Sequence, residues 1–229
     1  MKIYFAGISG NKKRLEYLKR FGAKRLMLTF ADKKYYGKQM YRFKNMEFEI
    51  LCDSGAFSVW KKNSKINIDE YCDFIKKNDI SKYINLDDIE NDDATDKNQK
   101  YMESKKLNPI PVFHYQSNFD NLKRIIDNGY KYICLGGSVG QTRNNKIKFF
   151  NNIFSKYDNI NFHGLGISDI EIVNNFPFFS VDSTTWLIAE KIGKIFDENG
   201  KRITPPLGMT SEEKFKNTIE YFVKMENLC

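Results

Sequence analysis

The chain has 229 residues, 41% of them hydrophobic and 29% charged, with a net charge of +8 and a pI near 9.1. This composition is ordinary for a soluble globular protein and excludes a disordered or fibrous chain, and the length suits one domain over residues 1–229. No apolar run approaches the roughly 18 residues of a membrane span or the apolar core of a signal peptide. Four scattered cysteines without a CxxC pair argue against a zinc ribbon and a disulfide framework, and favour a cytoplasmic location.

Short β-rich apolar runs recur along the chain and alternate with helix-like segments. The eight runs are residues 2–8, 25–31, 48–52, 83–86, 109–113, 132–135, 159–162 and 178–181. Most are continuously apolar, which is typical of parallel strands that are buried on both faces. Apolar spacing and stop residues predict helices at residues 11–21, 69–77, 121–128, 170–175, 187–195 and 212–225. The link from residue 31 to 48 shows no clear helix, and residues 197–210 indicate a loop or hairpin.

Strands that alternate with helices predict a parallel sheet with right-handed crossovers. Eight such strands favour an α/β fold of the closed (β/α)8, TIM-like barrel type. An open doubly wound sheet is the alternative. Both architectures place the functional site beyond the carboxyl ends of the strands.

Six of the eight runs are followed directly by polar residues or glycines. These are Asp53-Ser54-Gly55, Asp87-Asp88, His114-Tyr115-Gln116, Gly136-Gly137-Ser138, His163-Gly164 and Asp182-Ser183-Thr184. Each has a structural explanation, since an Asp can cap the next helix, a His can be a satisfied core residue and Gly-Gly can form a turn. Their joint placement at one edge of one sheet instead predicts a site.

The residue types in this set restrict its chemistry. The chain has no P-loop and no GxGxxG motif, so no nucleotide cofactor is expected. Several carboxylates with glycines around a flat pocket suit glycosyl chemistry, in which one carboxylate forms a covalent intermediate and another moves a proton. A metal site made by His114, His163 and an Asp is an alternative, although we expect no metal.

Four segments resemble the tRNA-guanine transglycosylases. CDSGAFSVW (52–60) is similar to their D-S/T-G-G-F-Q segment, and LDDIE (86–90) resembles their F-D-E segment. YICLGGSVG (132–140) looks like their glycine-pair segment, and HGLGISDIEIVNNFPFFSVDSTTW (163–186) is similar to their segment ending in F-D-C. The four occur in the family's order.

The resemblance implies a role for each matching residue. Asp182 would be the nucleophile on C1′ of the target guanosine, and Asp53 the general acid/base for the purine nitrogen. Asp87 would bind the amino and ring N–H edge of the base, with Asp88 as a competitor. Gly136 and Gly137 would contact the base carbonyl or its 7-substituent. The remaining candidates for base binding are His114 or Gln116, in place of the family's Gln, and the adjoining Ser54, Gly55, His163 and Gly164.

The departures from the family pattern concern the substrate. The family's C-terminal zinc site is absent, Ala56 replaces the second Gly, and Ser58 replaces the Gln. This compact, zinc-free pattern looks more like the phage-encoded DNA transglycosylases, which exchange guanine for a 7-deazaguanine such as 7-cyano-7-deazaguanine (preQ0). The resemblance therefore implies DNA and a free 7-deazaguanine as partners, with no cofactor. Base exchange on tRNA, a hydrolytic nucleic-acid N-glycosidase and a non-catalytic nucleic-acid-binding protein are the alternatives.

The positive charge is concentrated at the start of the chain. Residues 1–50 hold 13 Lys+Arg and 4 Asp+Glu, whereas residues 51–229 hold 24 and 25. This asymmetry predicts a phosphate-binding surface rather than a generic lysine-rich one. Its candidate residues are Lys12, Lys13, Arg14, Lys19, Arg20, Lys24 and Arg25. Phe57, Trp60 and Tyr115 are candidates to stack on the base.

Overall fold

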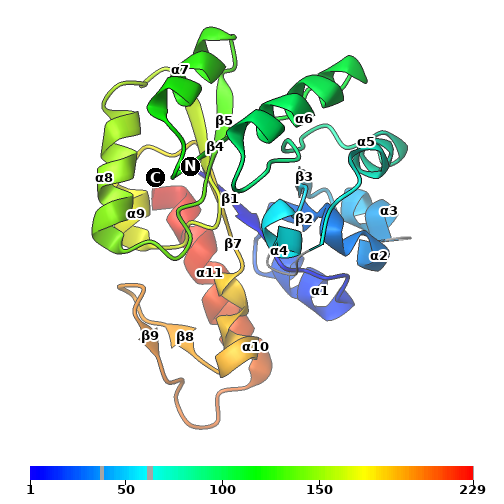
Figure 1. Ribbon diagram of the computed structural model, residues 1–229. Helices are drawn as coiled ribbons and strands as arrows, with labels where there is room; N and C mark the ends of the chain where they lie inside the picture. Colours follow the sequence, from blue (N-terminus) through cyan, green and yellow to red (C-terminus); the bar gives the residue numbers. More distant parts are fainter. Residues whose placement is uncertain (37–38, 61–63, 229) are drawn as a thin grey trace.

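The computed structural model describes residues 1–36, 39–60 and 64–228. Its main feature is a curled sheet of seven parallel strands in the order β3-β2-β1-β7-β6-β5-β4, surrounded by helices (Figure 1). The strands are β1 (Lys2–Phe5), β2 (Arg25–Thr29), β3 (Glu49–Asp53), β4 (Val112–His114), β5 (Tyr132–Gly136), β6 (Asn161–Gly164) and β7 (Ser180–Ser183).

A short extended segment joins the two edge strands of this sheet. Tyr83 forms a parallel bridge with Cys52 of β3, and Ile84 forms another with Ile110, which lies just before β4. Backbone hydrogen bonds of 2.8–2.9 Å support both bridges. The fold is therefore the expected α/β TIM-like barrel, with the fourth of the eight predicted strands reduced to two bridges.

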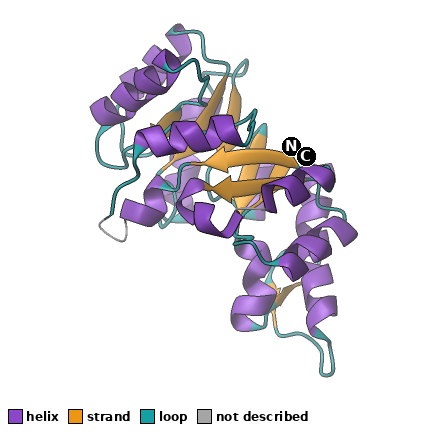
Figure 2. Cartoon of the chain, turned by 90° about the vertical axis from the view of Figure 1, so that its right-hand side faces the viewer, coloured by secondary structure: helices purple, strands orange, loops and turns teal. Residues whose placement is uncertain are grey.

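The helices follow the strands along the chain and cover the outside of the sheet (Figures 1 and 2). They are α1 (Lys12–Arg20), α2 (Lys33–Tyr36), α3 (Gln39–Asn45), α4 (Ala56–Trp60), α5 (Ile68–Lys77), α6 (Asp92–Ser104), α7 (Phe119–Asp127), α8 (Arg143–Phe154), α9 (Ile170–Asn175), α10 (Ile188–Ile192) and α11 (Ser211–Leu228), with 3₁₀ turns at Phe30–Asp32 and Thr185–Leu187. The link between residues 31 and 48 thus contains two short helices, contrary to prediction.

Sequence reasoning did not identify α4, α6 and α8 as helices. The described residues of α6 are mostly polar, and its start depends on the Asn91 side chain, which accepts a hydrogen bond from the backbone N–H of Ala94. Capping by a short polar side chain thus starts a helix whose apolar stripe is weak. A hairpin is present, as one reading of residues 197–210 predicted, but it begins earlier: its strands are β8 (Ile195–Phe196) and β9 (Arg202–Ile203), which lie beside α10, away from the main sheet (Figure 1). Helix α10 therefore ends at Ile192 and not at the predicted residue 195.

Two apolar clusters hold the barrel together. The smaller fills the interior with residues that alternate along the strands, including Tyr4, Met27, Leu51, Val112 and Cys134. The larger lies between the strands and the surrounding helices. Because every strand is buried on both faces, the strands read as continuous apolar runs in the sequence.

Two strands end earlier than predicted. The run 2–8 gives a strand that ends at Phe5, so Ala6 and Gly7 belong to the following loop. The run 25–31 gives a strand that ends at Thr29, followed by the turn that contains Asp32. Both early endings add residues to the carboxyl-end loops, where the candidate site lies.

Candidate functional site

A cavity of about 540 Å³ opens at the carboxyl ends of the strands. It brings together Asp53, Asp87 and Asp182, which are far apart in the sequence. His114, Gly136 and Gly137, which were also predicted to belong to the site, line the same cavity. A TIM-like barrel meets its ligands at this end, since the loops that follow the strands converge there.

Asp53 is the last residue of β3, and its Oδ2 accepts a hydrogen bond from the backbone N–H of Gly55 at 3.1 Å. The first backbone N–H of the next helix, that of Ala56, donates instead to Ser54 Oγ at 3.2 Å. Burial, together with the neighbouring charges of Asp87 and Asp182, raises the pKa of Asp53 to about 8. At neutral pH Asp53 therefore holds a proton that it can donate.

Asp182 lies on β7 and is 7% exposed. Its Oδ1 accepts a hydrogen bond of 2.8 Å from the backbone N–H of Gly166, in the loop after β6. The backbone N–H of Thr185 is bound by Ser183 Oγ at 2.9 Å, so Asp182 is not needed as a helix cap. A carboxylate fixed through one oxygen at a cavity wall is suited to nucleophilic attack through the other.

Asp87 is buried and held by two side chains. Ser54 Oγ donates to its Oδ1 at 3.4 Å, and His114 Nε2 lies 2.9 Å from its Oδ2. Because a carboxylate only accepts hydrogen bonds, His114 Nε2 carries the hydrogen of this pair. Both partners fix the direction of the Asp87 carboxylate, as recognition of a polar ligand edge requires.

The glycine pair after β5 is required by its surroundings. A Cβ on Gly136 would lie 3.0 Å from His114 Cδ2, so the imidazole packs directly on the backbone. Gly137 has φ +73°, and a Cβ there would lie 2.7 Å from Gln116 Oε1. The absence of side chains at these positions keeps that wall of the cavity flat.

The structure separates the alternatives that the sequence left open. His114 lines the cavity, whereas Gln116 is exposed and its side chain bonds to the carbonyl of Ile89. Asp87 lines the cavity, whereas Asp88 lines a neighbouring cavity.

Several predicted base-binding residues lie behind the cavity wall. Ser54, Gly55, His163 and Gly164 do not line it, and His163 is fully buried inside the barrel. Tyr115 packs against Phe149 of α8 with ring centroids 5.1 Å apart, so it is a packing residue rather than a stacking one. Tyr115 follows His114 directly and therefore faces the opposite side of the sheet. His163 faces the interior but lies one layer below the cavity, level with Ser180 and Cys134.

Sequence reasoning missed part of the cavity lining. Gly7, Thr29 and Asp32 come from the first two strand ends, which were placed too late in the chain, and Gly166 and Ser168 come from the loop after β6. Asp32 is the first acidic residue after the second apolar run, and this position could have identified it.

Aromatic residues lie at the rim of the cavity on α4. Phe57 and Trp60 are about 40% exposed, with rings stacked at a centroid distance of 6.1 Å. Phe57 lines the main cavity, and Trp60 lines an adjoining one of about 470 Å³ that shares Asp87 and Ile89 with it. Exposed stacked rings beside a pocket are suited to planar ligands such as nucleic-acid bases.

The predicted basic residues do not form one surface around the cavity. Helix α1 follows β1, so it runs from the cavity end of the barrel to the opposite end. Lys12 and Lys13 are exposed at the cavity end, where Arg14 pairs with Glu190 and donates to the Gly7 carbonyl.

The other four candidates lie toward the opposite end of the barrel. Lys19 is 3.8 Å from Glu47, Arg20 pairs with Glu212, and Arg25 pairs with Glu49 and Glu226. Lys24 is exposed there. Phosphate binding near the cavity is therefore left as a prediction for Lys12 and Lys13.

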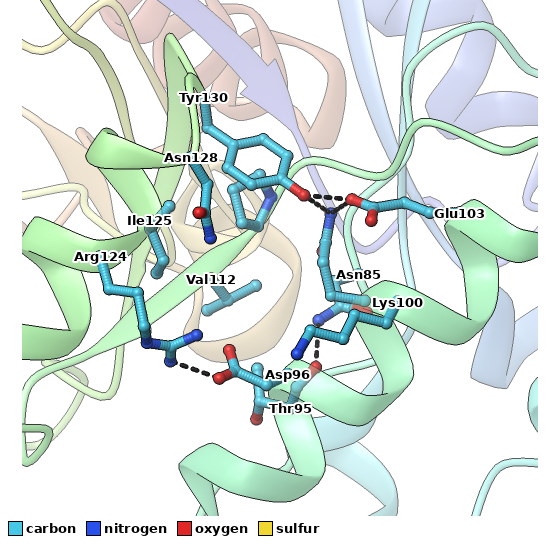
Figure 3. A pocket seen from close by; sticks show the side chains of 12 residues that line it. Asn85, Thr95, Asp96, Lys100, Glu103, Val112, Arg124, Ile125, Asn128 and Tyr130 are labelled. Carbon is cyan, nitrogen blue, oxygen red and sulfur yellow. Dashed lines mark hydrogen bonds and ion pairs between the residues drawn. The ribbon is translucent and has the colours of Figure 1, made fainter.

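A further cavity, of about 290 Å³, lies between α6 and α7 and beside β4 (Figure 3). Ion pairs and hydrogen bonds cross it, including Arg124 with Asp96 and Tyr130 with Glu103. The buried Asn85 donates to the Thr95 carbonyl at 2.9 Å. None of the strand-end carboxylates lines this cavity, and we assign it to helix packing.

Two further absences concern the described residues. Among them, no three metal-ligating side chains are grouped so as to hold an ion. No helix within the described ranges is long and apolar enough to cross a bilayer.

Comparison with known proteins identifies the fold but no family. No family model and no curated protein matches the chain. A structure from Aquifex aeolicus VF5, described only as a structural study, has a TM-score of 0.61 at 10% identity and covers 98% of this chain and 93% of its own. The tryptophan synthase alpha chain from Legionella pneumophila has a TM-score of 0.58 at 10% identity, covering 99% and 91%. A mutant tryptophan synthase alpha-subunit from Pyrococcus furiosus has a TM-score of 0.56 at 11% identity, covering 97% and 96%.

Proposed function

We propose that this protein is a DNA guanine transglycosylase, which exchanges a guanine of DNA for a free 7-deazaguanine such as preQ0. One observation carries the proposal: the residues that match the family's nucleophile, acid/base and base-binding Asp all line one cavity, and one of them, Asp53, has a raised pKa. Paired carboxylates in different environments are typical of enzymes that cleave glycosidic bonds.

The first half of the reaction removes guanine. The target nucleotide is flipped out of the duplex or presented in a single strand, because its C1′ is otherwise inaccessible. The carboxylate of Asp182 attacks C1′, the C1′–N9 bond breaks, and Asp53 gives its proton to the departing base. A glycosyl ester on Asp182 and free guanine result.

The second half installs the new base. The 7-deazaguanine enters the cavity, and the ionised Asp53 takes its N9 proton. N9 then attacks C1′, and the ester electrons return to the Asp182 carboxylate. Two inversions give net retention of configuration, and Asp53 regains the proton that the next cycle requires.

The cavity walls supply recognition of the planar base. Asp87, held by Ser54 and His114, accepts hydrogen bonds from the amino and ring N–H groups of the base. The flat wall at Gly136 and Gly137 gives a planar ring close access to the backbone. Phe57 and Trp60 at the rim stack on the target base or its neighbour.

The direct test is mass spectrometry of nucleosides from substrates incubated with the protein and preQ0. We expect deazaguanine nucleoside in the DNA sample. Incorporation into tRNA alone would transfer the same chemistry to tRNA. Abasic sites formed without preQ0 would indicate a hydrolytic N-glycosidase, and salt-sensitive binding with no product would indicate a binding protein.

A further inference from the structure

Buried polar side chains form a line inside the barrel beneath Asp182. Ser180 and Asp182 are two residues apart on β7, so both face the interior. His163, on the neighbouring β6, is paired in register with Ser180 and is fully buried. Its Nδ1 lies 2.8 Å from Ser180 Oγ, and its Nε2 lies 3.4 Å from Asp182 Oδ1. The imidazole therefore spans the space between these two side chains.

The hydrogens along this line can be assigned from the chemistry of the groups. The Asp182 carboxylate only accepts, so His163 Nε2 carries a hydrogen in the neutral ring and in the protonated one. In the neutral ring, Nδ1 accepts from the Ser180 hydroxyl, and Ser180 Oγ accepts from the Tyr132 hydroxyl at 2.7 Å. Burial raises the pKa of Tyr132, so its phenol retains this hydrogen. Every donor then points toward Asp182.

Packing holds the imidazole in this orientation. The rings of Tyr4 and Tyr132 meet it edge-on, with centroid distances of 5.9 Å and 6.5 Å. Nε2 is buried and forms no hydrogen bond with the described residues; Asp182 Oδ1, at 3.4 Å, lies just outside good hydrogen-bonding geometry. A buried donor without a hydrogen-bond partner costs stability, and a native protein that keeps one calls for a functional explanation.

We propose that His163 is a positioning residue for the nucleophile Asp182, an inference that rests on the proposed transglycosylase function. Its Nε2–H and the backbone N–H of Gly166 hold Oδ1, which leaves Oδ2 to form the bond to C1′. The 3.4 Å contact shortens when substrate binds, as catalytic hydrogen bonds of unliganded enzymes commonly do. This role replaces the predicted contact between His163 and the base.

The two donors also act when the intermediate breaks down. In the glycosyl ester, Oδ1 is the carbonyl oxygen and still accepts both hydrogen bonds. When N9 of the incoming base attacks C1′, the C1′–Oδ2 bond breaks and its electron pair returns to the carboxylate. The donors of His163 and Gly166 stabilise the negative charge that forms there.

Exchange kinetics test the proposal. We expect His163→Met, which preserves side-chain bulk, to lower kcat about 10- to 100-fold with little change in KM, because the interaction strengthens only in the transition state. His163→Gln, which can place an N–H near the same point, should recover part of this loss. A wild-type kcat in His163→Met would overturn the proposal. If His163→Met kept the wild-type kcat while Asp182→Asn was inactive in the same assay, the positioning role would be refuted and the proposed transglycosylase function would stand.

A measurement without substrate distinguishes failure of the positioning role from failure of the function. The chain contains only two histidines, so the imidazole ¹⁵N signals of the labelled, unliganded protein can be assigned with His114→Gln. We expect a hydrogen on Nε2 of His163 and a change in its signal in Asp182→Asn. A hydrogen on Nδ1 alone would overturn the proposal, whether or not the protein exchanges bases. If His163→Met does not fold, the ¹⁵N spectrum still tests the proposal, together with Ser180→Ala. We expect Ser180→Ala to lower kcat several-fold, and a wild-type kcat in that variant would count against the positioning role.

Discussion

Glu49 and Asp53 lie four residues apart on β3, on the same side of the strand, yet their environments shift their pKa values in opposite directions. At the amino end of the barrel, Glu49 accepts hydrogen bonds from Tyr4 at 2.7 Å and Arg25 at 2.9 Å, and it pairs with Lys82. Burial alone would raise the pKa of Glu49, but hydrogen bonds from Lys82 and Tyr4 outweigh it and lower the pKa to about 2.

Asp53, at the carboxyl end of the same strand, has the opposite surroundings. Burial and the charges of Asp87 and Asp182 raise its pKa to about 8, and no Lys or Arg of the described residues lines its cavity. Uncompensated like charges reduce the stability of the fold and are characteristic of functional sites. The charges at the amino end of the barrel therefore stabilise the fold, whereas those at the carboxyl end are what the proposed reaction requires.

The largest expected effect comes from removing the proposed nucleophile, Asp182, at the carboxyl end. Asp182→Asn should lower exchange of labelled guanine into DNA by about 10³-fold or more, and it should form no covalent DNA adduct, because an amide is a poor nucleophile. Asp88→Asn, which changes a carboxylate outside the main cavity, is the matched control. Wild-type exchange by Asp182→Asn would refute the assignment.

Asp53→Asn should lower exchange by about 10²- to 10³-fold, because it removes the proposed proton donor. In the wild type, exchange should decline as the pH rises through about 8, the pKa of Asp53. The pKa of Asp53 is raised on folding from 3.8 to about 8, so between these values the folded chain keeps a proton that the unfolded chain has lost. The contribution of Asp53 to the free energy of unfolding should therefore decrease from about pH 4 to pH 8. The melting temperature of Asp53→Asn relative to wild type should rise over the same window. If the difference in melting temperature between Asp53→Asn and the wild type did not change with pH, Asp53 would be ionised in the folded protein.

Glu49→Gln should affect the fold and leave the chemistry unchanged. Removing this partly buried charge from Arg25 and Lys82 should lower the free energy of unfolding by about 2 kcal/mol at pH 7. Its pKa is lowered on folding, so this contribution is present above about pH 4.5 and is lost as the pH falls toward 2. Denaturant unfolding of both proteins between pH 2 and 7 measures it. Loss of exchange in the folded variant would contradict the division between the two ends.

The smallest effect concerns the lysines at the two ends of the barrel. Replacing Lys12 and Lys13 with Ala should weaken DNA binding several-fold and reduce the salt dependence by about one to two counterions. Lys24→Ala, an exposed lysine toward the opposite end, is the matched control and should bind like the wild type. Equal losses in both variants would show that DNA covers more than the cavity end. Affinity measured over a salt series gives both quantities.

Much of the barrel could be predicted because its signals are local. Continuous apolar runs arise from burial on both faces, so all eight strand positions were found, including the one reduced to bridges at Tyr83 and Ile84. The polar helix α6 was missed because its start depends on the Asn91 cap. The ends of β1 and β2 were misplaced because apolar loop residues continue their runs.

By itself, the sequence determined which residues lie at the carboxyl ends of the strands, since chain order places these ends at one edge of a parallel sheet. It therefore identified Asp53, Asp87 and Asp182 together. Only the tertiary structure decided which side chains enter the cavity, because that depends on which side of the sheet a residue faces and on its height along the barrel, which the strand register sets. That is why His114 lines the cavity while His163 lies beneath Asp182. The opposite pKa shifts of Glu49 and Asp53 likewise depend on charges brought close by folding.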